Sequence, residues 1–369
     1  MAAETHPPPT TIAFPILAIA FVFLAPVIGF DAAAQPPTPF SLSLSAAMVV
    51  IMFGAVFAAV YHADVIAHRV GEPFGTLVLT MAVTIIEVAL IESIVLTPGS
   101  SPALARDTVF AVIMVVCNGL VGLCILWGGL RHHEQEFQTS GTGVYISVLA
   151  ALSVLTLVLP NYTATAIGPY FSNAQLVFVS IVTAVLYVAF LFIQTYRHTD
   201  YFRADSYSAP GEHHVYPSNK AVAISVTMLL LALCGVILIA KKFAIILEIG
   251  LSMVGAPPAV AGIIIAIVVL APESITAVRA AQRNELQKSL NLALGSSLAT
   301  IGLTIPAVAI TNVFLGKQIE IGLSQRDTLL LALTLFLSLL TFGSGRTNIL
   351  AGLVHLVVFA TFLFLVFIP

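Results

Sequence analysis

The sequence predicts an all-α polytopic membrane protein with about eleven spanning helices. Of its 369 residues, 59% are hydrophobic and only 8% are charged, a composition that no water-soluble core of this length requires. The apolar residues recur in runs of about 20, the length at which a helix crosses a hydrocarbon layer of ~30 Å. These runs do not alternate as the ~10-residue strands of a membrane β-barrel do. Helices are therefore the expected spanning element.

The expected helices follow from cutting the chain at Pro, Gly and clusters of charge. They cover residues 11–30, 44–62, 74–97, 107–130, 143–160, 174–195, 221–240, 258–278, 290–313, 327–343 and 347–368. The segment 241–257 is open between a short half-helix and a loop. The first run has no Lys or Arg in the ten residues that open the chain and exceeds the length of a signal-peptide core, so we expect it to remain as an uncleaved helix.

The longest polar stretch, residues 196–220, divides five helices from five others. We therefore predict four parts: a tail and extra helix at 1–40, a first five-helix repeat at 41–195, a cytoplasmic linker at 196–220, and a second repeat at 221–369. Because five is odd, the second repeat enters the membrane upside down relative to the first. Inverted repeats of this kind are typical of secondary transporters.

The orientation follows from Lys and Arg in the short loops. With a cytoplasmic N-terminus, nine of these residues fall on the inner side and five on the outer side. The inner ones are Arg69, Arg131, Arg197, Arg203, Lys220, Arg279, Arg283, Lys288 and Arg346; the outer ones are Arg106, Lys241, Lys242, Lys317 and Arg326. The excess predicts a cytoplasmic N-terminus, with the Lys241–Lys242 pair as the exception.

Two acidic residues lie deep in the predicted membrane spans. Nearly all of the 17 Asp and Glu residues are in loops or near helix ends, but Glu87 and Glu273 occupy the second helix of each half at corresponding places. A charge at this depth costs about 2.5–3.5 kcal/mol even on the gentler insertion scale, so both are candidates for function. Each can hold a proton or a metal cation in turn. The structural alternative is a protonated acid hydrogen-bonded to a neighbouring helix.

Other oxygen-bearing side chains are spaced to share a site with these acids. Thr84 lies three residues before Glu87 and Thr276 three residues after Glu273, each on the same helix face. The next helix of each half adds Asn118, Ser296 and Ser297. Calcium takes about 6–8 such oxygens. Alternatively, Ser and Thr in membrane helices bond their own backbone.

Pro272 directly precedes Glu273 and removes a backbone donor, so it is expected to kink the helix and to free a carbonyl oxygen for a cation. Glu92 is five residues from Glu87 and nearer the helix end. We rank it as a secondary site or as a side chain that reaches the interface.

The histidines have functional and structural interpretations. His62 and His68 are candidates for pH sensing, since unperturbed histidine titrates near 6.5, or are ordinary interfacial residues. The segments 131–137 ("RHHEQEF") and 211–214 ("GEHH") are weak metal sites or solvated loops. His355, inside the last helix, is expected to be a packing residue. The same is expected of Cys117, Cys124 and Cys234, which form no metal or redox motif.

The stretch "APESITAVRAAQRNELQKSLNLALGSSLATIGLTIP" (271–306) resembles the second α-repeat of the calcium:cation antiporter superfamily, in its cation/proton exchanger branch. The spacing of that motif matches Glu273, "TAV" at 276–278 and "GSS" at 295–297. The stretch 71–93 resembles the first repeat, with Glu87 at the position of its acidic residue. The segments "HADVIAHRVGEPFGTLVLT" and "FIQTYRHTDYF" are similar to a bacterial type that exchanges calcium, or sodium and potassium, for protons.

The resemblance implies a function and a site. It implies two inverted five-helix repeats plus one N-terminal helix, alternating access around Glu87 and Glu273, Ca²⁺, Na⁺ or K⁺ exchanged for H⁺, and no cofactor. It also implies the inner membrane of a bacterium. Thr84 and Leu270 stand where the family usually has Asn three residues before each Glu. Without these two Asn side chains the site has fewer strong calcium ligands. We therefore expect it to bind sodium or potassium, or several ions, rather than calcium selectively.

Two other classes of function are weighed against the antiporter. A passive cation channel lined by Glu87 and Glu273 has the same buried acids, but the repeats favour a carrier. A membrane enzyme needs a nucleophile with its base or a His-rich metal site, and the sequence has neither HExxH nor GxSxG in a helix. Nothing is basic enough for nucleic acid, and no phosphate-binding loop is present. The expected partners are inorganic cations, protons and the lipid bilayer.

Overall fold

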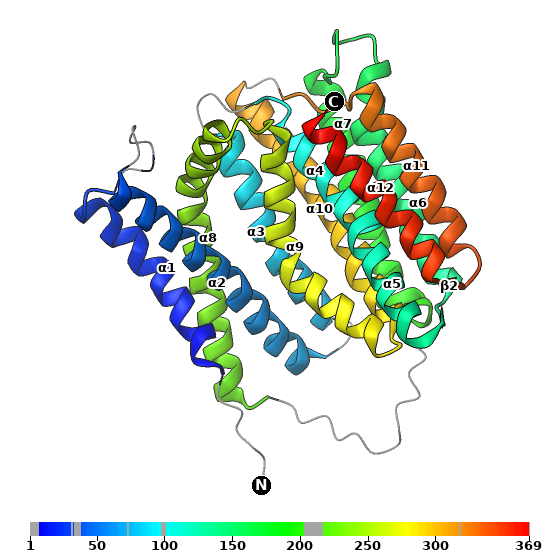
Figure 1. Ribbon diagram of the computed structural model, residues 1–369, viewed down its shortest axis with the longest axis horizontal. Coiled ribbons are helices and arrows are strands. Elements are labelled where there is room, and N and C mark those ends of the chain that lie inside the picture. The colour runs from blue at the N-terminus through cyan, green and yellow to red at the C-terminus, as the bar shows by residue number, and fades with distance from the viewer. Residues whose placement is uncertain are drawn as a thin grey trace. The chain divides into compact units, whose positions relative to one another are not determined.

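The computed structural model describes residues 7–30, 32, 38–71, 74–96, 101–202, 217–316 and 319–368, and these residues are almost entirely helical (Figure 1). All eleven expected helices are present, and ten helical segments of the described chain are long and apolar enough to cross a membrane. The predicted all-α polytopic fold is confirmed. Most of the predicted linker, with its "GEHH" segment, lies outside the described residues.

Twelve α-helices form most of the described chain. The α-helices are α1 (Pro9–Val27), α2 (Pro39–Val70), α3 (Phe74–Val95), α4 (Leu104–Met114), α5 (Val121–His132), α6 (Thr139–Ser153), α7 (Asn173–Phe192), α8 (Asn219–Met253), α9 (Ala259–Gln282), α10 (Leu286–Leu315), α11 (Gln325–Phe342) and α12 (Ile349–Phe367). Three π-helical segments continue α4, α6 and α7, at η1 (Val115–Leu120), η2 (Val154–Val158) and η4 (Ile193–Arg197), and 3₁₀ turns follow at η3 (Leu159–Tyr162) and η5 (Thr199–Tyr201).

Several helices begin where the sequence supplies a capping side chain. Thr38 accepts from the backbone N–H of Ser41, whose hydroxyl in turn accepts from the N–H of Thr38, a reciprocal cap at the start of α2. Ser172 and Gln175 form the same arrangement at α7. These caps satisfy backbone donors that the first helical turn leaves without partners.

Two expectations about local structure are corrected. Residues 241–253 are neither a half-helix nor a loop, since α8 continues through both lysines to Met253 and Lys242 lies over the Phe30 ring at 5.5 Å. The segment 131–137 is not a solvated loop. Its residues Glu134–Glu136 form β1, which pairs antiparallel with β2 (Arg346–Asn348), and Gln135 is 1% exposed.

The chain forms two compact units, and neither is continuous in sequence. Unit 1 is Met1–Ser100 with Tyr207–Gly255, and unit 2 is Ser101–Ser206 with Ala256–Pro369. In unit 1, α1, α2, α3 and α8 pack together. The Phe14 ring of α1 fills the space beside Gly54 of α2, where any larger side chain would collide with it.

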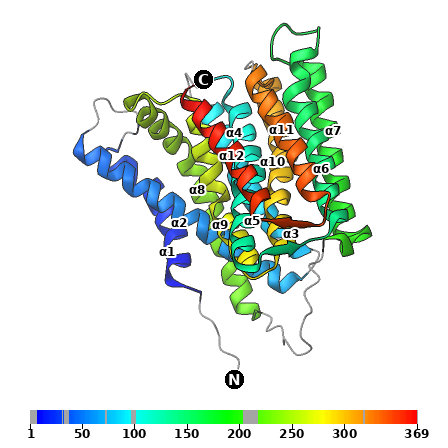
Figure 2. The ribbon, with the colours of Figure 1, turned by 45° about the vertical axis from the view of Figure 1, so that its right-hand side comes forward.

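Unit 2 has two ends, which we call the Arg106 end (residues 101–107, 157–172 and 319–327) and the Arg131 end (residues 131–138, 279–291 and 343–348). Backbone hydrogen bonds join the three segments of the Arg106 end, from Glu320 to Pro102 and from Leu323 to Leu157. At the Arg131 end, β1 pairs with β2, and the Gln135 amide donates to the Ala281 carbonyl at 2.9 Å. The helices lie side by side between these ends (Figures 1 and 2).

Corresponding helices of the two predicted halves run in opposite directions through unit 2. The fourth helix of the first half, α6, ends at the Arg106 end, where Asn161 donates to the Leu323 carbonyl. Its counterpart α11 begins there. Likewise α7 begins at the Arg106 end, whereas α12 finishes there, because Arg326 donates to the Leu365 carbonyl at 2.8 Å. This reversal is what inverted repeats require.

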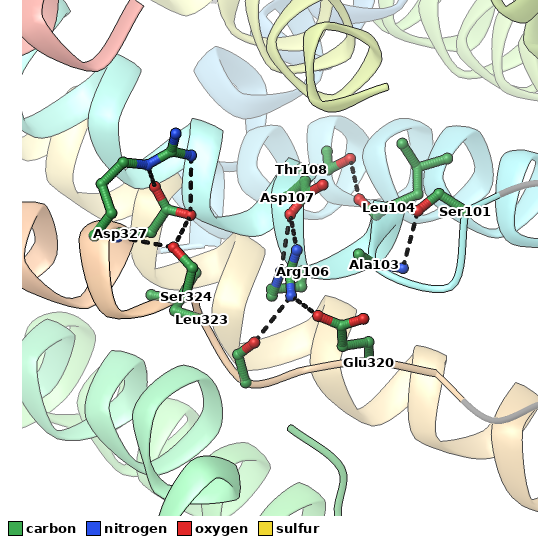
Figure 3. Close-up of polar contacts among 12 residues, drawn as sticks. Ser101, Ala103, Leu104, Arg106, Asp107, Thr108, Glu320, Leu323, Ser324 and Asp327 are labelled. Carbon is green, nitrogen blue, oxygen red and sulfur yellow. Dashed lines mark hydrogen bonds and ion pairs between the residues drawn. The ribbon is translucent and has the colours of Figure 1, made fainter. Parts of the chain in front are cut away.

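A network of charges holds the Arg106 end together (Figure 3). The Arg106 guanidinium, 12% exposed, is bound to the Asp107 carboxylate at 2.8 Å, to Glu320 and to the Gly322 carbonyl at 3.0 Å. It therefore ties the start of α4 to the segment between α10 and α11. Next to it, the Ser324 hydroxyl donates to the Asp327 carboxylate at 2.7 Å and accepts from the Asp327 backbone N–H, which caps α11.

We predict that Arg106→Gln lowers the free energy of unfolding by about 3 kcal/mol, because two partly buried carboxylates then lose their cation. The measurement is unfolding of the purified protein in mixed micelles. As a control, Arg346→Gln removes an arginine whose pair with Glu136 is mostly exposed, and should cost less than about 1 kcal/mol. Equal losses in the two variants would show that the Arg106 network is not a structural tie.

Candidate functional site

Glu273 lies inside unit 2, one residue after the proline in α9. It is 7% exposed, and the Ser296 hydroxyl of α10 hydrogen-bonds its carboxyl group. The second carboxyl oxygen, Oε2, is buried and has no hydrogen-bond partner among the described residues. A buried polar atom without a partner is costly, so this oxygen marks a place for a proton, a water molecule or a cation.

The helix α10, which packs against α9, presents a face rich in hydroxyl groups. Buried on α10 are Ser289, Ser296, Ser297, Thr300 and Thr304. At ~100° per residue these five fall within an arc of about 100°, and they extend over about 22 Å of helix. The Ser297 and Thr304 hydroxyls have no hydrogen-bond partner among the described residues. One face of α10 is therefore polar along much of its length.

Only part of this face was predicted from the sequence. Ser296 and Ser297 were predicted from the "GSS" stretch, whereas Ser289, Thr300 and Thr304 were not. Their spacing was the available signal, because hydroxyl residues separated by 7, 8, 11 and 15 positions from Ser289 return to one side of a helix. Thr300 donates to the Ser296 carbonyl at 3.0 Å, and Ser289 lies against the Cys124 thiol.

Tyr187 of α7 approaches Glu273 because Gly302 makes room for it. The phenol is 2% exposed and lies within electrostatic reach of the Glu273 carboxyl. A Cβ at position 302 would be 2.6 Å from Cγ of the tyrosine ring. Gly302 therefore allows α7 to pack closely against α10 beside the buried acid.

Two residues near Glu273 on α9 differ from what a cation site uses. Thr276 is exposed, and its hydroxyl donates to the Pro272 carbonyl at 3.1 Å. Leu270, one turn before the acid, is 2% exposed and apolar. The carbonyl of Val268 loses its usual helical donor because Pro272 has no N–H. On this helix the oxygens available beside Glu273 are therefore mainly backbone carbonyls.

Asn118 is placed in the π-helix η1 and faces two other helices. Its Nδ2 donates to the Thr334 hydroxyl of α11 at 2.8 Å, and its Oδ1 accepts from Nδ1 of His355 in α12 at 3.1 Å. The other ring nitrogen of His355 then accepts from Thr341 at 3.0 Å. Asn118 and His355 are 0% exposed. His355 is thus a satisfied interior histidine, as the sequence analysis expected.

This network gives Asn118 a structural role. Both ends of its amide are engaged, with α11 and α12, so Asn118 joins three helices. Its oxygen keeps a second lone pair, so its role as a cation ligand stays a prediction. A π-helix contains an extra residue per turn and turns side chains away from the α-helical faces, which spacing along the sequence does not reveal.

In unit 1, Glu87 and Thr84 are buried in α3, at 2% and 4% exposure. The Thr84 hydroxyl donates to the Thr80 carbonyl at 2.8 Å, so its oxygen lone pairs stay available. Glu92 is half-buried and nearer the end of the helix. Glu87 is therefore a second acid inside a helix of a membrane protein.

The two pH-sensing candidates differ sharply. His62 is 0% exposed, and its ring bridges the Ser225 hydroxyl of α8 at 3.1 Å and the Thr11 carbonyl of α1 at 3.0 Å. It therefore joins three helices inside unit 1, and its role in pH sensing stays a prediction. His68 is exposed, with Nδ1 2.8 Å from the Asp64 carbonyl oxygen.

The described residues contain no group of three or more His, Cys, Asp and Glu side chains arranged to hold a metal ion. A cation at Glu273 would therefore rely on hydroxyl and carbonyl oxygens besides the carboxylate. Cys117 and Cys124 are buried as packing residues, whereas Cys234 is exposed on α8.

Comparison with known proteins gives consistent matches. The profile of the family "Sodium/calcium exchanger protein" matches residues 40–196 and 224–368. The chain is 34% identical over 369 residues to the sodium-potassium/proton antiporter ChaA of Escherichia coli, covering 99% of this chain and 98% of that protein. It is 47% identical over 321 residues to y4hA of Sinorhizobium fredii, provisionally named an ionic transporter, with 86% and 87% covered.

Solved structures share the fold. The Ca²⁺/H⁺ antiporter YfkE, in its selenium-substituted crystal form, aligns with a TM-score of 0.71 at 18% identity, covering 97% of this chain and 100% of that chain. The H⁺/Ca²⁺ exchanger CAX aligns with a TM-score of 0.70 at 14% identity, covering 96% and 87%.

We predict that Gly302→Ala lowers the free energy of unfolding by about 1–3 kcal/mol, because the added methyl group displaces Tyr187 from a tightly packed site. The control is Gly295→Ala on the same helix, where the new Cβ would meet Tyr145 at an ordinary 3.7 Å. Thermal unfolding in detergent distinguishes the two. If both variants have the same melting temperature, the close packing of α7 on α10 does not depend on Gly302.

We also predict non-additive effects at the Asn118 network. Asn118→Leu and His355→Leu should each cost about 1–3 kcal/mol, because each leaves a buried polar partner unsatisfied. The double variant should cost less than the sum by about 0.5–3 kcal/mol. A control cycle pairs Asn118→Leu with Lys288→Gln, an exposed residue, and should be additive. Additivity in both cycles would contradict the network.

Proposed function

We propose that the chain, which belongs to the sodium/calcium exchanger protein family of secondary cation exchangers, is a cation/proton antiporter. It exchanges cytoplasmic cations for protons, with Na⁺ and K⁺ favoured and Ca²⁺ as a further candidate. Its relatives are transporters rather than enzymes, in agreement with the sequence analysis. The observation that carries the proposal is the buried Glu273, whose Oε2 has no described partner and whose carboxyl binds Ser296 of the hydroxyl face of α10.

The site holds one positive charge at a time. A proton on the Glu273 carboxyl neutralises it, whereas a cation needs the ionised form. Because an unneutralised charge in a membrane interior is costly, release of one ligand is linked to binding of the other. A proton exchanged for one monovalent cation leaves the local charge unchanged. The Ser297 hydroxyl, next to Ser296 on α10, supplies a further neutral oxygen that either ligand or its water can use.

The ion preference follows from the number of strong ligands. Calcium takes about 6–8 oxygens, usually several of them charged or amide oxygens. Beside Glu273 the structure offers hydroxyl groups and backbone carbonyls, and the buried Leu270 contributes none. The name of the full-length relative, a sodium-potassium/proton antiporter, supports the same order. We therefore place Na⁺ and K⁺ before Ca²⁺.

Glu87 is the second proton- and cation-carrying group of the proposal. It is as deeply buried as Glu273, and the Thr84 hydroxyl lies one turn away on α3. The reversed helices of unit 2 and the two segments matched by the family profile support an inverted-repeat carrier that works by alternating access. Its place is the inner membrane of a bacterium, with the N-terminus and the Arg131 end cytoplasmic, since that side holds more Lys and Arg.

The test uses protein in liposomes with a trapped pH dye. Adding Na⁺, K⁺ or Ca²⁺ outside should move protons in the wild type, with the largest signal for a monovalent ion. Glu273→Gln and Glu87→Gln should each abolish this flux, because a neutral amide cannot trade a proton for a cation. The control is Glu248→Gln, a half-buried acid on α8 that should keep most of the flux.

Other outcomes are decisive as well. Cation flux without coupled proton movement would indicate a channel. Normal proton flux in Glu273→Gln would exclude Glu273 as the exchanging group. A calcium response much larger than those to Na⁺ and K⁺ would overturn the proposed ion order.

A further inference from the structure

The Arg131 end of unit 2 contains a basic pocket that the proposed transport mechanism does not use. It has a volume of about 580 Å³ and is lined by Arg131 and His132 of α5, Arg279 and Gln282 of α9, and Arg283 directly after α9. The three arginines are exposed, and the lining contains no carboxylate. The His132 ring, through Nε2, lies 3.0 Å from the Gln282 carbonyl and joins the two helix ends.

The positive charge of this pocket is largely uncompensated. Within the described residues none of the three arginines forms an ion pair, whereas Lys288 and Arg346 at the same end are paired with Glu285 and Glu136. Two helices end at the pocket, and each C-terminus contributes about −0.5 charge. Three guanidinium groups therefore leave about two positive charges for an anion.

Guanidinium groups select the shape of the anion as well as its sign. Arginine presents paired N–H donors that match the oxygens of a phosphate group, and it is less hydrated than lysine. Basic pockets between helix ends on the predicted cytoplasmic side of a membrane are suited to anionic headgroups. We propose that this pocket binds a phosphate group, carried by an anionic phospholipid or by a soluble phosphate.

A phosphate group bound in this pocket would contact the end of α9, the helix that contains Glu273. Arg279 and Arg283 lie six and ten residues after Glu273, and α9 is helical throughout. A bound phosphate would join the ends of α5 and α9 by pairing with arginines from both. The proposal does not rest on the transported ion, because its test measures occupancy of the pocket alone.

The chain provides its own probe of the pocket. Its single tryptophan, Trp127, lies one turn before Arg131 on α5 and is 48% exposed. Residues four apart on a helix share a face, so a lipid whose headgroup sits at Arg131 places its chains near this indole. Brominated lipid chains quench tryptophan fluorescence on contact. Quenching of Trp127 therefore reports occupancy directly.

The experiment places the full chain in phosphatidylcholine bilayers with increasing fractions of brominated phosphatidylglycerol, compared with brominated phosphatidylcholine. We expect phosphatidylglycerol to bind preferentially, and each arginine changed to glutamine to reduce that preference about fivefold at low salt. The triple variant Arg131→Gln/Arg279→Gln/Arg283→Gln should abolish the preference for phosphatidylglycerol. Lys288→Gln/Arg346→Gln removes two paired charges from the same end and should retain it.

A second arm distinguishes the source of the phosphate. Inorganic phosphate is measured by equilibrium dialysis in phosphatidylcholine bilayers, with chloride at equal ionic strength as the control. Phosphate binding that the triple variant loses, without a lipid preference, identifies a soluble ligand. Absence of both signals, or equal loss in the Lys288/Arg346 control, overturns the proposal. If the triple variant does not fold, Arg131→Gln and Arg283→Gln singly must each show the reduced preference.

Discussion

The cost of keeping the Glu273 carboxyl group away from water governs what can surround it. An acid in an apolar interior survives only if its oxygens find donors, a proton or a cation. Unit 2 provides one donor, from Ser296, and leaves the other oxygen open. Full satisfaction by protein groups would make this residue a fixed structural element. Partial satisfaction leaves room for a proton, a water molecule or a cation, which is what the proposed exchange requires.

The rest of unit 2 holds the helices around that acid in place. The ionic network around Arg106 closes one end, and the pairing of β1 with β2 closes the other. Between them, Asn118 and His355 connect η1, α11 and α12 through side-chain hydrogen bonds. Because η1 also packs against α9 and α10, these contacts help to hold the helices around Glu273 together.

The sequence was sufficient for the features that depend on composition and local spacing. Runs of apolar residues predicted all eleven helices, and the depth of Glu87 and Glu273 in their spans was enough to single out both acids. The sequence was insufficient where residues far apart along the chain come into contact. It was also insufficient where an α-helix changes to a π-helix and its side chains point in other directions. The contacts of Asn118 could not be predicted, because η1 shifts its direction and its partner His355 is 237 positions away. The buried bridge made by His62 and the strand formed by residues 134–136 depend likewise on segments far along the chain.

The pairing of β1 with β2 has a consequence for how the protein is made. The two strands are separated by about two hundred residues, and β2 precedes the last helix. A chain emerging from the ribosome therefore exposes β1, with its unpaired backbone groups, until nearly all of the protein has been synthesised. The Arg131 end is completed only when α11 and α12 are inserted. Premature termination before β2 would leave an open strand edge, which quality-control proteases and other chains can recognise.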